Sequence, residues 1–212
     1  MALFIDSADR TLIEAVWPSG VFDGVTTNPT ILARAGLASK DVPELYRWLS
    51  DLGVRRIFVQ VTGRTVKEML TSADAIRGLG VVTVKVPATA DGFAACRVLV
   101  EDGAQVLLTA VYHPVQGLMA RDMGIQGVAP YVGRMTDAGR AGVPAVIQMQ
   151  QAIGHSPTRI LAASLRSPED VATLAAAGVP DFTLGAALVQ QVLHDPLTES
   201  AVDEFERAAQ GS

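Results

Sequence analysis

Short apolar segments alternate with longer amphipathic segments from one end of the chain to the other. The apolar segments are rich in β-branched residues, whereas the segments between them repeat their apolar positions with the period of a helix. The strands are predicted at 2–6, 24–27, 56–61, 81–86, 105–110, 127–130, 159–164 and 181–184. The clearest helices are predicted at 66–79, 90–103 and 167–178.

Eight strands separated by helices predict an α/β fold, a (β/α)8 TIM barrel that forms a single domain over residues 1–212. The strands are almost continuously apolar, as expected of parallel strands that are covered on both faces. A doubly wound open sheet is the main alternative, but no GxGxxG turn follows the first strand. An additional amphipathic helix is predicted at 197–209, with Leu197, Val202 and Phe205 on one side. We expect it to pack on the barrel or on a neighbouring molecule.

The composition excludes several classes of function. The chain is 49% hydrophobic with a mean hydropathy of +0.30, which suffices for one large core. A net charge of −5 with 5% aromatic residues lacks the basic surface of a nucleic-acid-binding protein. No apolar segment approaches the roughly 18 residues of a membrane span, and Asp6 interrupts the apolar N-terminus where a signal peptide requires continuity. We therefore expect a cytoplasmic protein without nucleic-acid or membrane partners.

The cysteine and histidine residues give no signal for a disulfide or a metal site. Cys96 is the single cysteine, and its neighbours in the sequence predict that it is buried and inert. His113, His155 and His194 are too scattered for a zinc site. No metal and no cofactor is predicted.

Lys85 is the most informative charged residue because it lies within a β-branched strand segment, VVTVKVP, that has no other charge. The chain has only three lysines against fourteen arginines, so a lysine here suggests a chemical reason. A buried ammonium either pairs with a carboxylate or loses its proton, and a neutral amine can form a Schiff base with a carbonyl. The alternative is a lysine that extends along the strand and places its amine in solvent.

Polar side chains occur at or just after the carboxyl ends of the predicted strands, which is where the active sites of (β/α)8 barrels lie. Individually they have structural explanations: Asp6 can cap a helix, Thr26 and Asn28 can belong to a turn, and Thr109 can bind backbone groups. Together they suit a polyhydroxylated carbonyl substrate with an anionic group. The set consists of Asp6, Thr26, Asn28, Gln60, Lys85, Thr109, Tyr131, Arg134 and Ser164.

Five segments, in order along the whole chain, resemble the small transaldolase family, most closely its fructose-6-phosphate aldolases. They are GVTTNPT (24–30), VKVPAT (84–89), TAVYHPVQGLMA (109–120), VAPYVGR (128–134) and ILAASLRSP (160–168). The resemblance implies class I aldolase chemistry on a barrel without a metal, with ketose and aldehyde sugar phosphates as substrates. It also implies a homo-oligomer, a pentamer or a decamer, in which the C-terminal helix reaches a neighbouring subunit.

By this resemblance, Lys85 forms the Schiff base, while Asp6 and Asn28 contact the hydroxyls of a dihydroxyacetone unit and assist proton transfer. Arg134 and Ser164 are expected to bind the phosphate of the aldehyde. Typical transaldolases have a glutamate on the third strand and often a phenylalanine after the sixth. This chain has Gln60 and Tyr131 instead, the pattern of the fructose-6-phosphate aldolases, in which the tyrosine moves a proton near a water held by the glutamine and Thr109.

Some positions depart from the family pattern and leave the substrate range open. Gly133 replaces a larger polar residue, and Gly185 replaces a proline. His113 can touch substrate or begin a helix in solvent, and Arg166 can add to an anion site or lie on the surface. The leading hypothesis is cleavage of fructose 6-phosphate into dihydroxyacetone and glyceraldehyde 3-phosphate. The alternatives are transfer of the dihydroxyacetone unit to an aldose, as in a transaldolase, and a non-catalytic barrel that binds sugar phosphates.

Overall fold

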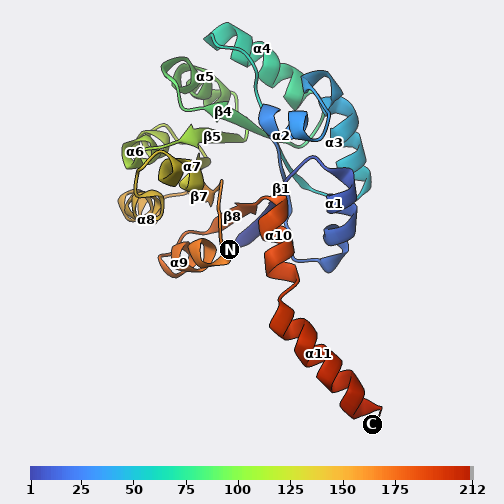
Figure 1. Cartoon of the computed structure of the whole chain (residues 1–212). Coiled ribbons are helices and arrows are strands. Elements are labelled where there is room, and N and C mark those ends of the chain that lie inside the picture. Colours follow the sequence, from blue (N-terminus) through green and yellow to red (C-terminus); the bar gives the residue numbers. More distant parts are fainter. Residues whose placement is uncertain (211–212) are drawn as a thin grey trace.

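Eight parallel strands close into a barrel in which each strand pairs with its neighbours in sequence and the last pairs with the first. The computed structural model describes residues 1–210. The predicted single barrel is confirmed (Figure 1). The strands are β1 (Ala2–Asp6), β2 (Gly24–Thr26), β3 (Arg56–Gln60), β4 (Thr83–Pro87), β5 (Val106–Val111), β6 (Gly127–Pro130), β7 (Arg159–Ala162) and β8 (Asp181–Leu184).

Five predicted strands have different ends in the structure: those at 24–27, 56–61 and 105–110 differ by one residue at an end, and those at 81–86 and 159–164 differ by two. The segment 81–86 starts at Thr83, because Val81 lies in the preceding turn with 81% of its surface exposed. The segment 159–164 ends at Ala162, because Ser164 turns out of the strand with a φ of 58°. In both cases an apolar or small-residue run continues beyond the hydrogen-bonded ladder, and hydropathy alone does not mark where pairing stops.

The helices surround the barrel, and the predicted helices at 66–79, 90–103 and 167–178 are confirmed with ends that differ by one or two residues (Figure 1). Two short 3₁₀ turns cover Trp17–Ser19 and Ser39–Asp41. The α-helices are α1 (Arg10–Val16), α2 (Pro29–Arg34), α3 (Val42–Asp51), α4 (Val66–Arg77), α5 (Ala90–Glu101), α6 (Pro114–Asp122), α7 (Val132–Asp137), α8 (Gly142–Ile153), α9 (Pro168–Ala176), α10 (Ala186–Leu193) and α11 (Pro196–Ala209).

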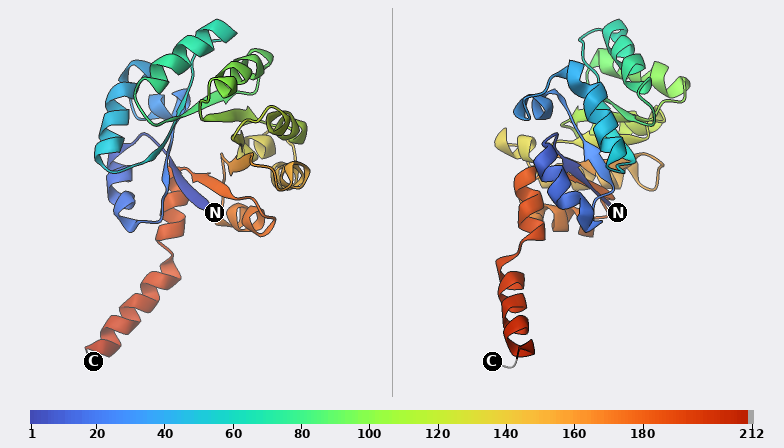
Figure 2. Two further views of the ribbon diagram at one scale, coloured as in Figure 1. Left: turned by 180° about the vertical axis from the view of Figure 1, so that it is seen from behind. Right: turned by 90° about the vertical axis from the view of Figure 1, so that its right-hand side faces the viewer.

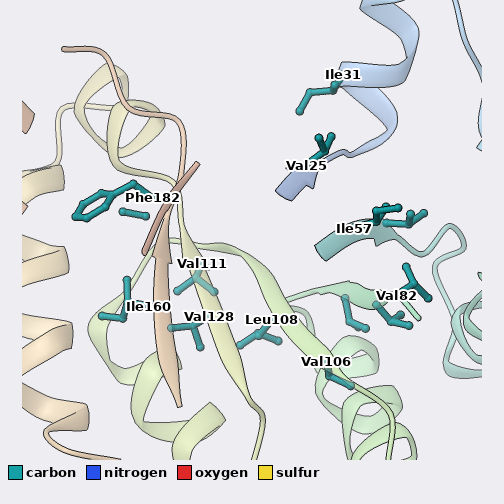
Figure 3. Close-up of a cluster of buried hydrophobic side chains, with 14 of the residues drawn as sticks. Val25, Ile31, Ile57, Val82, Val106, Leu108, Val111, Val128, Ile160 and Phe182 are labelled. Carbon is teal, nitrogen blue, oxygen red and sulfur yellow. The ribbon is translucent and has the colours of Figure 1, made fainter. Parts of the chain in front are cut away.

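Alternate residues of each strand face opposite sides, which divides the buried side chains into two clusters. The larger cluster fills the layer between the strands and the helices and includes Val25, Leu108 and Ile160 (Figure 3). The smaller cluster fills the barrel interior at the amino ends of the strands and consists of Ala2, Phe4, Phe58, Leu107, Ala129 and Leu161. Apolar side chains therefore occupy the interior at the amino end, where a cavity of about 150 Å³ remains, and a larger cavity lies at the carboxyl ends of the strands.

The C-terminal helix α11 extends away from the barrel (Figures 1 and 2). None of its residues is buried, and Leu197 and Phe205 are 82% and 67% exposed. The predicted helix is thus present, but the expectation that it packs on its own barrel is wrong. Packing on a neighbouring molecule stays a prediction.

Within residues 1–210, no helix combines the length and the apolar character that crossing a membrane requires.

Candidate active site

A cavity of about 320 Å³ opens at the carboxyl ends of the strands, a size within the range of small-molecule sites. It brings together seven of the side chains that the sequence singled out, which come from β1, β4 and the segments after β2, β6 and β7. They are Asp6, Asn28, Lys85, Tyr131, Arg134, Ser164 and Arg166. Thr26 and Thr109 are buried just beyond the lining residues and contact them.

Lys85 lines the cavity but is only 3% exposed, so the expectation of an inward-facing lysine on β4 is confirmed. Its amine donates a 2.7 Å hydrogen bond to the carbonyl oxygen of Thr27 and makes no ion pair within residues 1–210. Burial lowers the pKa of Lys85 below its ordinary value, and the charge of Asp6 offsets only part of this effect. The site therefore favours a neutral, nucleophilic amine.

Asp6 is held in place by Thr26 of the neighbouring strand β2. The Thr26 hydroxyl donates a 2.6 Å hydrogen bond to Asp6 Oδ1 and lies 2.6 Å from the hydroxyl of Thr183 on β8. Asp6 does not cap the first helix, because Asp9 does so. The Asp6 carboxylate therefore lines the cavity, where a bound molecule can contact it, while the Thr26 hydroxyl points toward Asp6.

Asn28 caps a helix and also lines the cavity. Its side-chain oxygen caps α2 by accepting hydrogen bonds from the backbone N–H groups of Thr30 and Ile31 at 2.9 and 3.0 Å. Because the oxygen is occupied in this way, the amide NH₂ group is the part that can donate to a substrate in the cavity. The turn explanation and the substrate-binding explanation are therefore compatible.

Tyr131 follows β6 and is only 7% exposed. Its phenol lies 3.1 Å from the hydroxyl of Thr109, and its ring packs edge-on against Tyr112. Burial raises the pKa of Tyr131, while the hydrogen bond to Thr109 partly opposes this effect. At neutral pH the phenol thus keeps its proton and can donate it toward the cavity.

Two arginines from neighbouring segments border the same side of the cavity. The guanidinium of Arg134 lies over the Tyr131 ring at 4.8 Å from its centroid. Arg166 pairs with Asp137 at 2.5 Å, and both of these side chains are mostly exposed. Arg166 therefore belongs to the cavity wall, but a carboxylate competes for its charge.

Ser164 adopts a left-handed conformation that is unusual for a residue other than glycine. Its carbonyl oxygen accepts a 2.7 Å hydrogen bond from the Gly133 N–H. A Cβ atom on Gly133 would lie 2.3 Å from this oxygen and 2.5 Å from Arg166 Nε. The glycine that departs from the family pattern thus makes room for the Arg166 side chain and for the close approach of α7 to the segment after β7.

Gln60 does not line the cavity and, unlike Thr26 and Thr109, makes no side-chain hydrogen bond to a lining residue within residues 1–210. It pairs in register with Lys85, yet it borders a separate groove that also contains Thr62 and Ser72. His113 also lies elsewhere, because its Nδ1 caps α6 by accepting a hydrogen bond from the Val115 N–H at 3.2 Å. The helix-start explanation of His113 is confirmed.

Two residues in or beside the site, Arg34 and Thr183, were not identified from the sequence. Arg34 at the end of α2 lines the cavity on the same helix face as Ile31. Thr183 contacts Thr26 in the barrel interior. The spacing of Arg34 three residues after Ile31 is a usable signal, whereas nothing in the sequence around Thr183 connects it with Thr26.

The described residues contain no group of three or more His, Cys, Asp or Glu side chains that could hold a metal ion. Cys96 is buried on α5, and burial raises the pKa of its thiol to about 12, so it is inert at neutral pH as expected. What the cavity offers is an amine, carboxylates, a phenol, an amide and guanidinium groups. This set suits chemistry on a polyhydroxylated carbonyl compound that carries a phosphate.

Similar known proteins support the barrel fold and identify the family of this chain. A crystal structure of a mandelate oxidase variant, with 4-Br-2-hydroxy-methylphenylacetate, superposes with a TM-score of 0.61 at 16% identity, and the alignment covers 88% of this chain. The chain spans 64% of that protein's length, and at this identity the match shows the fold alone. The profile of the transaldolase/fructose-6-phosphate aldolase family matches residues 3–211. The chain therefore belongs to this family of aldolase- and transaldolase-type enzymes.

Proposed function

We propose that this protein is a class I aldolase that reversibly cleaves fructose 6-phosphate into dihydroxyacetone and glyceraldehyde 3-phosphate. The observation that carries the proposal is Lys85, a buried lysine that lines the cavity without an ion-pair partner in residues 1–210. A cation in this position costs free energy unless it loses its proton. Imine formation uses the neutral amine that results.

The reaction begins when the Lys85 amine adds to the C2 carbonyl of the open-chain ketose, and loss of water leaves an iminium ion. The bond between C3 and C4 then breaks, its electron pair moves toward the iminium nitrogen, and the C4 hydroxyl loses its proton as the aldehyde forms. Protonation of the resulting enamine at C3 and hydrolysis of the imine release dihydroxyacetone and regenerate the amine. Each step needs a proton donor or acceptor beside Lys85.

Asp6 and Tyr131 are the groups that supply these proton transfers. Asp6 is a carboxylate at the cavity wall and accepts a proton as the imine forms. Tyr131 keeps its own proton at neutral pH, so it first donates this proton to the hydroxyl that leaves as water when the imine forms, and the resulting phenolate then accepts the C4 hydroxyl proton as the C3–C4 bond breaks. Thr109, at 3.1 Å from the phenol, fixes the direction of that donation.

The phosphate of the aldehyde part is assigned to the side of the cavity formed by Arg134, Ser164 and Arg166. Guanidinium groups bind phosphate by charge-assisted hydrogen bonds. Asn28 follows β2, which is opposite β6 in the closed strand order, so it is placed to donate to the dihydroxyacetone part. The substrate then spans the cavity with its reacting carbons beside Lys85.

Transaldolase activity is the second candidate, because the matching family contains both activities. In that reaction an aldose accepts the enamine before water can release it. Gln60 favours the aldolase, since glutamine cannot titrate and a glutamate occupies the corresponding place in typical transaldolases. We expect Gln60→Glu to raise the ratio of transfer to cleavage, and an unchanged ratio would remove Gln60 from this role.

The direct test is incubation of the purified protein with fructose 6-phosphate, with and without erythrose 4-phosphate, followed by measurement of the products. Free dihydroxyacetone formed without an acceptor supports the aldolase. Turnover that depends on erythrose 4-phosphate supports the transaldolase instead. Lack of any turnover with either mixture would leave a barrel that binds sugar phosphates without cleaving them and would contradict the proposal.

A further inference from the structure

Three side chains from β1, β2 and β8 form a hydrogen-bonded row in the barrel interior. Thr183 is 2% exposed, Thr26 is completely buried, and Asp6 lines the cavity. The Thr183 and Thr26 hydroxyl oxygens are 2.6 Å apart, and Thr26 Oγ1 is 2.6 Å from Asp6 Oδ1. Thr183 is separated from Thr26 by 157 residues in sequence, so only closure of the barrel brings the two together.

The direction of both hydrogen bonds follows from the number of protons available. An ionised carboxylate only accepts, so the single hydroxyl proton of Thr26 is donated to Asp6. Thr26 then has only lone pairs to offer on its other side, and Thr183 must be the donor to Thr26. If Thr26 donated to Thr183 instead, its oxygen and Asp6 Oδ1 would face each other as two acceptors in a buried place, which costs free energy.

With the donors in the order Thr183, Thr26, Asp6, the two threonines orient the carboxylate, and the carboxylate alone faces the cavity. Because its proton is committed to Asp6, Thr26 cannot donate to a substrate, and it does not line the cavity. Asp6 Oδ1 is fixed, so the other carboxylate oxygen is the one that remains for proton transfer. Hydrogen bonds in a row strengthen one another, and the donor at the end of the row stabilises the whole arrangement.

We propose that Thr183 is a positioning residue, which acts through Thr26 to hold Asp6 in the orientation that the proton transfers at Lys85 require. The inference rests on the proposed function, since it assigns Thr183 to that reaction. It predicts an effect on turnover that is larger than any effect on substrate binding, because Thr183 touches no part of the cavity.

The test uses Thr183→Val, which keeps the shape of the side chain and removes the hydroxyl. We expect kcat for cleavage of fructose 6-phosphate to fall about tenfold, as the loss of roughly one hydrogen bond in the transition state would cause, with KM changed less than about threefold. Thr183→Ser restores the donor and should return kcat to within about twofold of the wild type. Thr183→Ala provides a second removal of the hydroxyl if the valine variant folds poorly.

Thr158→Val is the matched control for loss of a buried threonine hydroxyl. Thr158 is 4% exposed and donates to the Ile125 carbonyl oxygen at 2.8 Å, away from the cavity. Its kcat should stay within about twofold of the wild type even though stability falls. If Thr158→Val lowers kcat as much as Thr183→Val does, the effect is general destabilisation and the positioning role is overturned.

A double-mutant cycle with Asp6→Ala separates positioning from packing. Without the carboxylate there is nothing for the row to hold, so Thr183→Val should lower kcat less than about twofold further in that background. A full tenfold loss there, or wild-type kcat in Thr183→Val alone, would overturn the role of Thr183 and leave the proposed function untouched. A wild-type protein without aldolase or transaldolase activity would overturn both.

Discussion

The two ends of the barrel interior are made by the same strands, yet they differ in chemistry. At the amino end Phe4 and Phe58 pack edge to face with their ring centroids 5.2 Å apart. Two residues beyond Phe4 on β1 and beyond Leu107 on β5, on the same inward face, Asp6 and Thr109 take part in polar contacts. The amino end of the interior is therefore lined by apolar side chains and the carboxyl end holds the candidate active site. The side chains change from apolar to polar within two residues along each of these strands.

The buried ionisable groups at the two ends also differ in their partners. At the amino end Asp181 is only 3% exposed, and Arg159 binds it with two hydrogen bonds of 2.6 and 2.7 Å. At the carboxyl end Lys85 is equally buried and has a single carbonyl oxygen as its hydrogen-bond acceptor. The paired carboxylate is neutralised and structural, whereas the unpaired amine is destabilised as a cation. We take that difference as the physical signature of the reactive group.

The largest effect that this comparison predicts is at the unpaired charge. We expect Lys85→Met to abolish turnover, because no other group in the cavity can form an imine. The same change should increase the free energy of unfolding at neutral pH by about 1–3 kcal/mol, since it removes an amine that must lose its proton or be buried as a cation when the chain folds. Steady-state assays and denaturant unfolding measure the two effects, and measurable turnover or a less stable variant would contradict the comparison.

The stability difference between Lys85→Met and the wild type should also depend on pH. Burial lowers the pKa of Lys85 in the folded protein, while the unfolded chain keeps a value of about 10.4. As the pH rises between these two values, the unfolded state binds more protons than the folded state, so the wild type gains stability with pH. The advantage of the methionine variant should therefore shrink toward pH 10, and an advantage that stayed constant would show that Lys85 titrates normally.

The next effect in size concerns the buried phenol. Tyr131→Phe removes the proton donor and should lower the cleavage rate about 100-fold, in the range of general acid–base catalysis. Imine formation at Lys85 should persist, which reductive trapping and mass measurement can show. Tyr112→Phe is the matched control, because Tyr112 contacts the Tyr131 ring without lining the cavity. Equal losses in the two variants would remove Tyr131 from its proposed role.

At the opposite end of the barrel, Asp181→Asn should affect stability and leave catalysis unchanged. The substitution removes the charge from the pair with Arg159, at a cost of about 1–2 kcal/mol in unfolding free energy, since Arg159 is half-exposed and water can replace part of the interaction. We expect kcat/KM to stay within about twofold of the wild type. A large loss of activity in a folded variant would mean that the two ends do not divide structure and function as described.

The smallest effect is expected at the exposed pair beside the cavity. Asp137→Asn frees Arg166, so KM for a phosphorylated aldehyde acceptor in the synthetic direction should fall about threefold, in keeping with the modest strength of surface ion pairs. KM for an uncharged aldehyde serves as the control and should not change. If both values change equally, Arg166 does not distinguish a phosphate.

The fold was predictable because most strand residues on both faces of the barrel sheet are apolar, and this leaves a strong local signal. The ends of β4 and β7 were less predictable, since Val81 and Ser164 continue an apolar or small-residue run outside the paired backbone. The environment of α11 could not be predicted, because an amphipathic pattern reveals an apolar side and does not identify what covers it.

The site was predictable where a residue contradicts its local pattern, as Lys85 does in a β-branched strand. Thr183 follows its pattern, since threonine is a normal strand residue, and its hydrogen-bond partner Thr26 is 157 residues away in the sequence. The position of Gln60 also depends on tertiary detail: its register with Lys85 agrees with the expected face, yet it borders a different groove. Local sequence thus identifies unusual residues but not the hydrogen bonds among ordinary ones.

The most direct test of the account is reductive trapping. The protein is incubated with fructose 6-phosphate, or with dihydroxyacetone, in the presence of sodium borohydride, and the modified peptide is identified by mass spectrometry. We expect a reduced three-carbon adduct on the peptide that carries Lys85. No adduct with either compound, or an adduct confined to Lys40 or Lys67, would contradict the claim that the buried, unpaired amine is the reactive group.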